Sequence, residues 1–318
     1  MMRKKLLASL ICLLFIFSGF QIAQGISIQK SLKNSGRTEY WGLLIAVGKY
    51  LNHPDEDRDR MLIRVEELYD TLLGSENWDS SHIKKIKAED ATLENILLGL
   101  NWLVINEGAE DISLVYITTH GYSMEYDLPP FDEQDGMDEA LIPYEGFENI
   151  YKFLSDDELN IYLSLLESKG VCVIIDSCHA GGFNDHKKSN ARSLNDIRST
   201  AKTLVSGFLG ELANLNRVVL MSCEEDELSF GSYFSRFLIE GLEGNADVND
   251  DNVFTAEEIF DYAEEILDEY DSQHPTILDL YSGELPITGK ISDFKNTKVI
   301  NFREFIKDRL PFFFKKNY

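Results

Sequence analysis

Four short apolar runs, rich in β-branched residues, alternate along the chain with longer segments in which apolar residues recur at helical spacing. The predicted strands are residues 41–47, 113–120, 171–177 and 217–222. The predicted helices between them are residues 59–73, 92–105 and 155–168. Continuous apolar strands are typical of a parallel sheet that is buried on both faces, and the alternation places helices on both faces. We therefore predict an α/β fold in which functional residues lie at the carboxyl ends of the strands.

The charge balance limits the kinds of partner that the chain can bind. Of its 318 residues, 55 are Asp or Glu and 30 are Lys or Arg, which gives a formal net charge of -25. Nucleic-acid binding relies on clustered basic side chains, so this composition argues against it. Metal ions and basic peptides are the partners that it favours.

Residues 1–25 have the pattern of a secretory signal peptide. A basic start is followed by the apolar stretch 6–20 and by the small residues Ala23 and Gly25. We expect the mature chain to be secreted or extracellular. The alternative is an uncleaved N-terminal membrane anchor with the protein facing outside the cell, although the apolar stretch is shorter than the ~20 residues of a spanning helix.

The remainder of the chain divides into a domain over residues 26–290 and a tail over residues 291–318. The tail ends in an apolar and basic run, residues 310–316. We expect this run to pack on the domain, with contact to a membrane surface as the alternative. The pattern does not define an oligomeric state.

Three cysteines remain once the first 25 residues are removed. They are Cys172, Cys178 and Cys223. Because the number is odd, at least one thiol is expected to be free in an extracellular setting, where disulfides are common. Cys172 and Cys223 lie in or at the end of apolar strands and are expected to be core residues. A disulfide between Cys172 and Cys223 is the alternative.

Polar chemistry begins abruptly at the ends of two predicted strands. His120 and Gly121 close one of them, and Cys178 follows the other. If the strands are parallel neighbours, the imidazole of His120 emerges beside the thiol of Cys178 and can take its proton, which leaves a nucleophilic thiolate. The backbone around Gly121 can then approach a developing oxyanion without a side chain in the way. His179 adjoins the nucleophile, but successive strand residues point to opposite faces, so we predict His120 as the base.

These strand ends resemble the signatures of a known family. His120 with Gly121, and the segment 176–181 (Asp-Ser-Cys-His-Ala-Gly), resemble the His-Gly and Asp-Ser-Cys-His-Ser/Ala-Gly motifs of metacaspases and related caspase-like peptidases. Residues 135–143 and 155–159 resemble the segments that metacaspases carry between the two catalytic strands, and the likeness runs over residues 41–242. The resemblance implies a caspase-like three-layer sandwich with a mainly parallel six-stranded sheet. It also implies a thiol peptidase with a Cys-His dyad.

The same resemblance implies a substrate pocket. Asp176 lies two residues before Cys178 and therefore on the same face of the strand. In metacaspases the matching aspartate lines the pocket for the residue before the cut and selects Lys or Arg. The alternative is a structural acid at a strand end. Asp226 is expected to add negative charge to this pocket.

The loop at 182–203 carries Lys187, Lys188 and Arg192 among Ser and Asn residues. A pocket for basic side chains would accept these three, and exposed loops are the usual sites of cleavage. We therefore expect self-cleavage in this loop, with an ordinary solvated loop as the alternative.

A calcium-binding pattern occurs further along the chain. Residues 247–258 have the spacing of a 12-residue EF-hand loop, and we refer to them as the calcium loop. Its oxygen ligands are expected from Asp247, Asn249, Asp251, Val253, Thr255 and Glu258. Asn252 replaces the usual glycine at position 6, where asparagine tolerates the left-handed backbone. The alternative is an acidic helix-capping turn without metal.

A second set of acids is implied by the resemblance alone. Asp138, Asp156, Asp157 and Asp185 match the acids that bind activating calcium in metacaspases, with a solvated acidic surface as the alternative. The leading interpretation is a calcium-responsive cysteine endopeptidase that cuts after basic residues. One alternative is a legumain-like or gingipain-like peptidase with a different preference, such as Asn. Another is a non-catalytic caspase-like calcium-binding module for adhesion or assembly.

Overall fold

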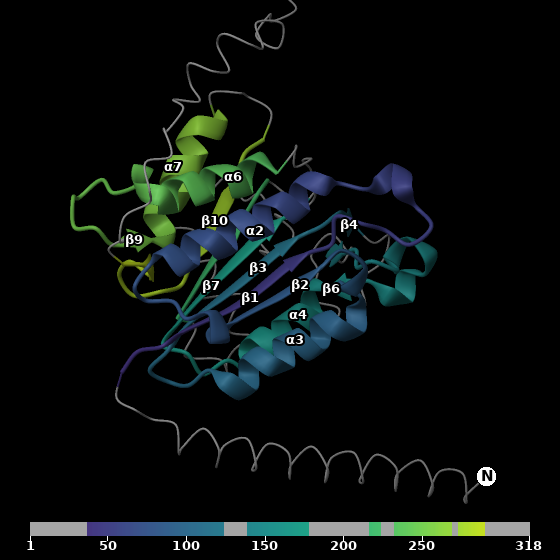
Figure 1. Ribbon diagram of the computed structural model, residues 1–318, viewed down its shortest axis with the longest axis horizontal. Helices are drawn as coiled ribbons and strands as arrows, with labels where there is room; N and C mark the ends of the chain where they lie inside the picture. The colour runs from purple at the N-terminus through teal and green to yellow at the C-terminus, as the bar shows by residue number, and fades with distance from the viewer. Residues whose placement is uncertain (1–36, 124–138, 178–215, 224–231, 269–272, 290–318) are drawn as a thin grey trace, which may run out of the picture.

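A six-stranded sheet forms the centre of the molecule (Figure 1). The computed structural model describes residues 37–123, 139–177, 216–223, 232–268 and 273–289. The strands are β1 (Tyr40–Ala46), β2 (Ile83–Lys87), β3 (Ile112–Thr118), β7 (Gly170–Asp176), β8 (Arg217–Met221) and β10 (Thr276–Asp279). Their order is β10-β8-β7-β3-β1-β2, and neighbours pair in parallel except for β10 with β8. This is the mainly parallel six-stranded sheet that the resemblance implies.

The interior strands β1, β3 and β7 are buried along their whole length. Side chains alternate between the two faces of a strand, and here both faces meet helices, which explains why these runs are continuously apolar. In β7, Cys172 and Ile174 pack into the core on one face of the sheet, whereas Val173 and Ile175 pack into the core on the other.

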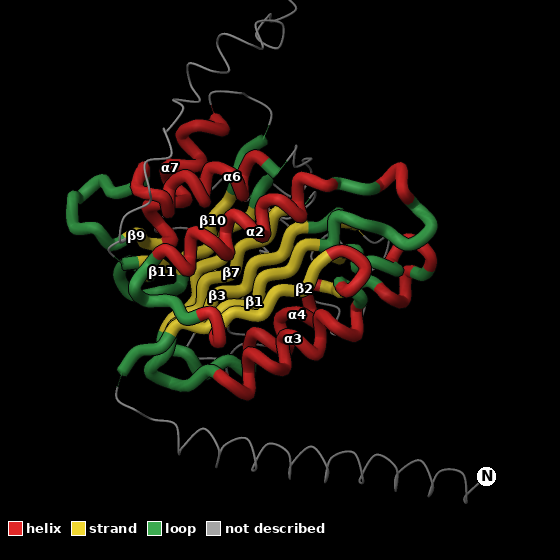
Figure 2. Tube along the Cα trace, in the orientation of Figure 1, coloured by secondary structure: helices red, strands yellow, loops and turns green. Residues whose placement is uncertain are grey.

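Helices cover both faces of the sheet (Figure 2). One layer contains α2 (Asp59–Gly74), α6 (Tyr233–Glu240) and α7 (Ala256–Asp268), and the other contains α3 (Leu93–Asn106) and α4 (Asp156–Ser164). Val65 of α2, Phe237 of α6 and Ile259 of α7 share one hydrophobic core. Leu100 of α3 and Leu159 of α4 belong to the other. The described part of the chain is therefore the three-layer α/β sandwich that was predicted.

Short elements complete the described fold. A second, antiparallel sheet contains β4 (Gly121–Ser123), β5 (Glu139–Leu141) and β6 (Leu154–Ser155), and β9 (Phe254–Thr255) pairs with β11 (Pro286–Thr288). The short helical turns are η1 (Pro54–Glu56), η2 (Ser80–His82), η3 (Ala88–Asp90), η4 (Gly146–Glu148), η5 (Ile150–Lys152) and the wider turn η8 (Gly241–Asn245).

The strands β2 and β10 are absent from the sequence prediction because neither is a continuous apolar run. In β2, which lies at one edge of the main sheet, only Ile83 and Ile86 are buried and lysines occupy the other positions. At the opposite edge, every residue of β10 is only partly buried. A strand that is not enclosed on both faces does not need a continuous apolar sequence.

One predicted helix is shorter in the structure. The helix α4 ends at Ser164 rather than at residue 168, because the Glu107 carboxylate accepts hydrogen bonds from the Glu167 N–H (3.2 Å) and the Ser168 hydroxyl (2.8 Å). These bonds hold the segment outside the helix. The helix α6 ends at Glu240, where the chain widens into η8.

The two described cysteines form no disulfide. Cys172 and Cys223 are fully buried, as predicted for core residues. Cys172 belongs to the core on one face of the sheet and Cys223 to the core on the other, so the disulfide that the sequence left open is excluded. Burial raises the pKa of the Cys172 thiol well above its usual range, which keeps it protonated and unreactive.

Three predicted segments lie outside the described residues: the signal peptide at 1–25, the basic loop at 182–203 and the tail at 291–318. Among the residues that are described, no helix combines the length and the hydrophobicity that crossing a bilayer requires.

Candidate active site

The carboxyl ends of β3 and β7 lie side by side. Thr118 of β3 pairs with Asp176 of β7, and the N–H of Thr119 donates a hydrogen bond to the Asp176 carbonyl at 3.3 Å. His120 follows directly, so it lies at the edge where the chain leaves β7 toward Cys178. Cys178 itself lies outside the described residues.

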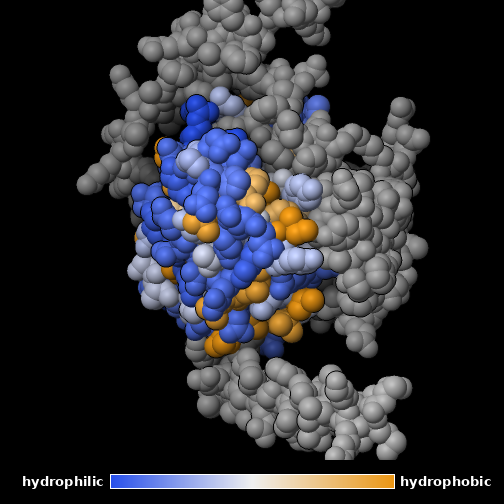
Figure 3. Space-filling model, turned by 90° about the vertical axis from the view of Figure 1, so that its right-hand side faces the viewer, coloured by the Kyte–Doolittle hydropathy of each residue, from blue (hydrophilic) through white to orange (hydrophobic). Residues whose placement is uncertain are grey.

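The strands point toward the right-hand side of Figure 1, and Figure 3 shows the molecule from that side. The described surface in this view is mainly hydrophilic, with smaller groups of hydrophobic side chains between.

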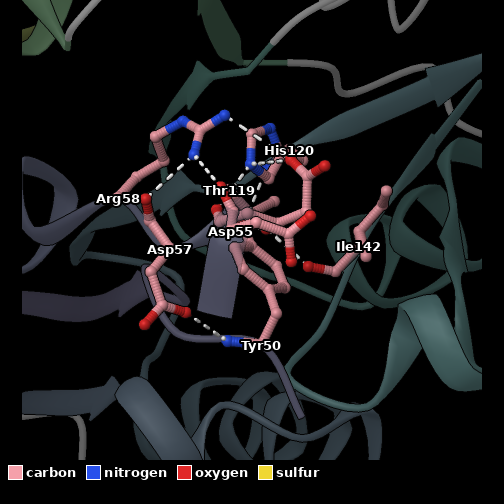
Figure 4. Close-up of polar contacts among 8 residues, drawn as sticks. Tyr50, Asp55, Asp57, Arg58, Thr119, His120 and Ile142 are labelled. Atoms are coloured by element: carbon pink, nitrogen blue, oxygen red, sulfur yellow. Dashed lines mark hydrogen bonds and ion pairs between the residues drawn. The ribbon is translucent and has the colours of Figure 1, made fainter. Parts of the chain in front are cut away.

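The imidazole of His120 is held by the loop between β1 and α2 (Figure 4). Its Nε2 lies 2.9 Å from the backbone carbonyl oxygen of Glu56 and 3.6 Å from the carboxylate of the same residue. A carbonyl can only accept a hydrogen bond, so Nε2 carries the hydrogen and the lone pair of the neutral ring lies on Nδ1. Burial lowers the pKa of His120, with a smaller contribution from the charge of Arg58, and the contacts with Glu56 oppose this shift. His120 is therefore a neutral base at neutral pH.

Aromatic rings enclose His120. Its ring centroid lies 5.0 Å from that of Tyr50 and 5.8 Å from that of Phe147. Phe147 also packs edge-on against Tyr50 at 5.0 Å, and His53 packs against Phe147 at 5.4 Å. Only 16% of the His120 side chain is exposed. These rings exclude water from the imidazole, which is the desolvation that lowers its pKa.

Replacing Phe147 by alanine is expected to raise the pKa of His120 toward the ordinary value of about 6.5, because water then reaches the ring. Since the wild-type pKa is lowered, the neutral base persists into more acidic solution in the wild type than in the variant. An NMR pH titration of the His120 ring measures the shift, and the acid limb of kcat/KM should move to higher pH with it. Ile150→Ala, which removes an exposed apolar side chain from η5, is the control. Equal His120 pKa values in Phe147→Ala and wild type would contradict the shielding role.

The loop that holds His120, residues 47–59, is closed at its base. Gly48 has a left-handed backbone with φ +59°, and its carbonyl accepts a hydrogen bond from the Arg58 N–H at 2.9 Å. The Arg58 guanidinium donates to the backbone carbonyls of the two residues that flank Glu56, at 3.2 and 2.9 Å. These bonds fix the backbone on both sides of the carbonyl that accepts from His120.

Ion pairs add to this closure. The Nζ of Lys49 lies 2.9 Å from a carboxylate oxygen of Asp57 and 2.7 Å from one of Asp59. The other carboxylate oxygen of Asp57 accepts a hydrogen bond from the Tyr50 N–H at 3.1 Å. The bond to Lys49 is the main cause that holds the pKa of Asp57 below its usual range. The pair therefore stays charged at neutral pH and keeps the loop closed.

The residue before Cys178 is fixed at both of its backbone polar groups. The Ser177 N–H donates to the Ser222 hydroxyl oxygen at 3.1 Å, and the same hydroxyl donates to the Ser177 carbonyl at 2.9 Å. The Cys223 thiol donates to that carbonyl at 3.3 Å, and the Gln273 amide donates to the Ser222 carbonyl at 2.6 Å. The segment after β8 thus holds the backbone that leads to the predicted nucleophile.

Asp176 is almost fully buried, with 2% of its surface exposed. One of its carboxylate oxygens accepts hydrogen bonds from the Ser235 N–H at 3.3 Å and from the Ser235 hydroxyl at 2.5 Å. Ser235 lies in the first turn of α6, whose N-cap residue Ser232 makes no side-chain capping bond. Asp176 therefore caps α6 from the sheet. This is a structural role in addition to the predicted pocket role, which these contacts do not test.

The calcium loop is ordered by hydrogen bonds from its own backbone. The carboxylate of Asp247 accepts from the N–H groups of Asp251 and Asn252, both at 3.1 Å. Asn249 accepts from the Asp251 N–H at 2.9 Å, and Asp251 accepts from the Val253 N–H at 2.8 Å. Asn252 has φ 60°, so it adopts the left-handed conformation expected of position 6.

Glu258, at the last position of the calcium loop, is 6% exposed. One of its carboxylate oxygens accepts from the N–H and the hydroxyl of Thr255, both at 3.2 Å, and the Thr255 hydroxyl oxygen accepts from the Glu258 N–H in return. The second carboxylate oxygen is buried without a hydrogen-bond partner among the described residues. Within the described ranges, no group of three or more His, Cys, Asp or Glu side chains is arranged to hold a metal ion.

The other predicted site residues are only partly described. Asp156 and Asp157 lie in the first turn of α4, a position that favours acids even without a metal. Gly121 is the first residue of β4. Four further residues lie outside the described ranges: Asp138, His179, Asp185 and Asp226.

Four residues that shape the site are absent from the sequence prediction: Tyr50, Glu56, Phe147 and Ser222. Each reaches the strand ends from a segment that is distant in sequence. Glu56 acts through a backbone carbonyl, which every residue type possesses, so its side chain carries no signal for this role.

The sheet order, the helices on both faces and the placement of His120 at a strand end give an α/β sandwich consistent with the caspase-like fold that the resemblance implies. Residues 58–187, a range that contains His120 and Cys178, match the model of the metacaspase, peptidase C14 domain. Over this range the sequence is similar to the metacaspase peptidase domain, which supports the resemblance seen in its motifs.

Two further comparisons concern whole chains. The solved structure of protein GSU0716 from Geobacter sulfurreducens matches with a TM-score of 0.51 and 13% sequence identity, over 79% of this chain and 99% of that one. At this identity the likeness shows the fold alone. A comparison with curated proteins finds none that matches the chain.

Proposed function

We propose that the chain is a cysteine endopeptidase in which Cys178 is the nucleophile and His120 is the base. The observation that carries the proposal is the neutral imidazole of His120, held by the Glu56 carbonyl at the sheet edge where β7 leads toward Cys178. The metacaspase match over a range that contains both residues supports it.

In the proposed reaction, Nδ1 of His120 takes the thiol proton of Cys178, and the thiolate attacks the carbonyl carbon of the peptide bond. As the C–N bond breaks, the imidazolium returns the proton to the leaving amine, which leaves a thioester. Water then gives a proton to His120 and its hydroxide to the acyl carbon, and the thiol leaves as the acid product is released. Gly121 is proposed to donate its backbone N–H to the oxyanion in both steps.

A preference for Lys or Arg before the cut is the finer part of the proposal. Asp176 and Asp226 are the proposed pocket acids, and the net charge of -25 favours basic substrates. Two features of the structure oppose this preference. The carboxylate of Asp176 is already bonded to Ser235, and Arg58 places a positive charge beside His120.

Hydrolysis of fluorogenic peptides that end in Arg, Lys or Asn tests the proposal on the mature chain. Cleavage after Arg and Lys is expected, cleavage after Asn alone would indicate the legumain-like alternative, and no cleavage of any peptide would favour the non-catalytic module. The same incubation tests self-processing, which is proposed after Lys187, Lys188 or Arg192. An active enzyme that remains a single intact chain would exclude self-processing.

Calcium binding by the calcium loop is part of the proposal, together with a secreted location that would supply the ion. One carboxylate oxygen of Glu258 is buried without a hydrogen-bond partner among the described residues, and such an oxygen is suited to bind a cation, since a buried anion is costly without a partner. The side chains of Asp247, Asn249 and Asp251 and the carbonyl of Val253 supply the hard oxygen donors that Ca²⁺ prefers. Asp138, Asp156, Asp157 and Asp185 are proposed as a second, weaker site.

Glu258→Gln is expected to weaken Ca²⁺ binding by at least about tenfold, because the variant loses the charge of the bidentate ligand at position 12. Calorimetric titration of the purified chain with CaCl₂ measures the affinity. Glu265→Gln, the same change at an exposed position of α7, is the control. Unchanged affinity in Glu258→Gln, or no binding to wild type, would exclude the loop as the site.

A further inference from the structure

We infer that Tyr50 is a positioning residue for His120, which it holds by the backbone while Glu56 holds the ring. This inference rests on the proposed function and adds a residue to it. Tyr50 lies in the loop 47–59 and is 3% exposed. Its hydroxyl oxygen is 3.0 Å from the backbone nitrogen of His120 and 3.0 Å from Oγ1 of Thr119 (Figure 4).

The direction of every hydrogen bond in this chain of contacts follows from its ends. The backbone N–H of His120 can only donate, so the Tyr50 hydroxyl oxygen accepts from it. The carbonyl of Ile142 can only accept, so the Thr119 hydroxyl donates its single hydrogen there. Between the two hydroxyl groups, Tyr50 must therefore be the donor. The N–H of Ile142 donates to the His120 carbonyl at 2.9 Å, which closes the ring of bonds.

Every hydroxyl and N–H hydrogen in this ring has an acceptor within the ring. Burial raises the pKa of Tyr50 to about 12, so its hydroxyl keeps the hydrogen that it donates to Thr119 at any pH at which His120 works as a base. A buried backbone N–H that loses its acceptor costs free energy and tends to shift until it finds another. Removing the Tyr50 hydroxyl therefore frees the backbone of His120 to move.

The loop 47–59 forms hydrogen bonds with His120 at two separate points. The Tyr50 hydroxyl fixes the backbone nitrogen, and the Glu56 carbonyl fixes Nε2 at 2.9 Å. Asp57, which directly follows Glu56, connects the two contact points. Its carboxylate accepts a hydrogen bond from the Tyr50 N–H and also pairs with Lys49. Two fixed points determine both the position and the rotation of the imidazole, which is what a base needs in order to face a thiol with Nδ1.

Tyr50→Phe, which keeps the ring and removes the hydroxyl, tests the inference. We expect kcat to fall about tenfold with KM little changed, since the net loss is one hydrogen bond that positions the base. Tyr40→Phe is the matched control, because Tyr40 is also buried and bonds Asn77 through its hydroxyl at the start of β1. A loss of stability alone would appear in both variants and would leave kcat of the folded protein unchanged.

Two NMR measurements on the ¹⁵N,¹³C-labelled protein make the result independent of peptidase activity. Tyr50→Phe should increase hydrogen exchange at the His120 amide and increase the fraction of the Nδ1–H tautomer of its ring. If both signals stay as in wild type, or if kcat of an active enzyme is unchanged, the positioning role is overturned. If wild type cleaves no peptide but both signals move, the proposed peptidase function fails while the positioning of His120 by Tyr50 stands.

Discussion

Replacing Cys178 or His120 by alanine is expected to lower kcat/KM by at least about a thousandfold, the largest effect of any substitution considered for this protein. Without Cys178 no thioester can form. Without His120 the thiol keeps its proton near neutral pH, and the leaving amine receives none. Initial rates on the best fluorogenic peptide measure the loss, with circular dichroism to show that each variant is folded.

Two matched substitutions separate loss of chemistry from loss of folding. Cys172→Ala removes a buried thiol from the core beside β7, and His82→Ala removes an imidazole that stacks on Trp41 at 3.9 Å, ahead of β2. Both controls are expected to lower the free energy of unfolding and to leave kcat/KM of the folded protein close to the wild-type value. If Cys178→Ala retains wild-type activity, the thiol mechanism is wrong; if only His120→Ala does, another group is the base.

Replacing Asp176 by alanine is expected to reduce the free energy of unfolding by roughly 2–3 kcal/mol, because the N–H of Ser235 is left buried at the start of α6 without its acceptor. The charge of Asp176 also favours the helix N-terminus, and the variant loses that contribution. Urea denaturation followed by circular dichroism gives the difference. A loss below about 0.5 kcal/mol would show that the capping bonds contribute little.

A pair of milder variants distinguishes the capping role of Asp176 from its proposed pocket role. Asp176→Asn keeps an oxygen that can accept from Ser235, so most of the stability should remain while the charge is lost. Ser235→Ala keeps the carboxylate and removes one of its donors. If Asp176 selects basic residues, the ratio of Arg to Asn cleavage falls in Asp176→Asn alone. If the ratio stays the same in both variants, the acid is structural.

The layered fold could be predicted from the sequence because the pattern that indicates it, a run of apolar residues, lies within each strand. The runs that form β1, β3 and β7 are apolar at almost every position, and burial on both faces permits little else. The lysine-rich sequence of β2 lacks that signal, because it lies at an edge of the sheet. The end of α4 depends on Glu107, about 60 residues earlier in the chain, so no local pattern reveals it.

The candidate site divides in the same way. His120 could be predicted because it follows an apolar strand abruptly and belongs to a recognisable motif. Asn252 could be assigned its left-handed backbone because its place in the calcium loop requires one. The contacts that orient His120 come from Tyr50 and Glu56, which precede it by 70 and 64 residues and meet it only in the folded protein. The capping of α6 by Asp176 likewise spans 59 residues.

The parallel pairing of β7 with β8 joins segments on either side of the basic loop at 182–203. Val171 to Ile175 pair with Arg217 to Met221 along the sheet, and both hydrophobic cores contain side chains from each strand. A backbone break in that loop would yield two polypeptides. One would contain His120 and the loop 47–59 that holds it, and the other would contain Ser222 and Ser235. They would still share one sheet and two cores. Covalent continuity across the loop is therefore not what holds the two halves of the site together.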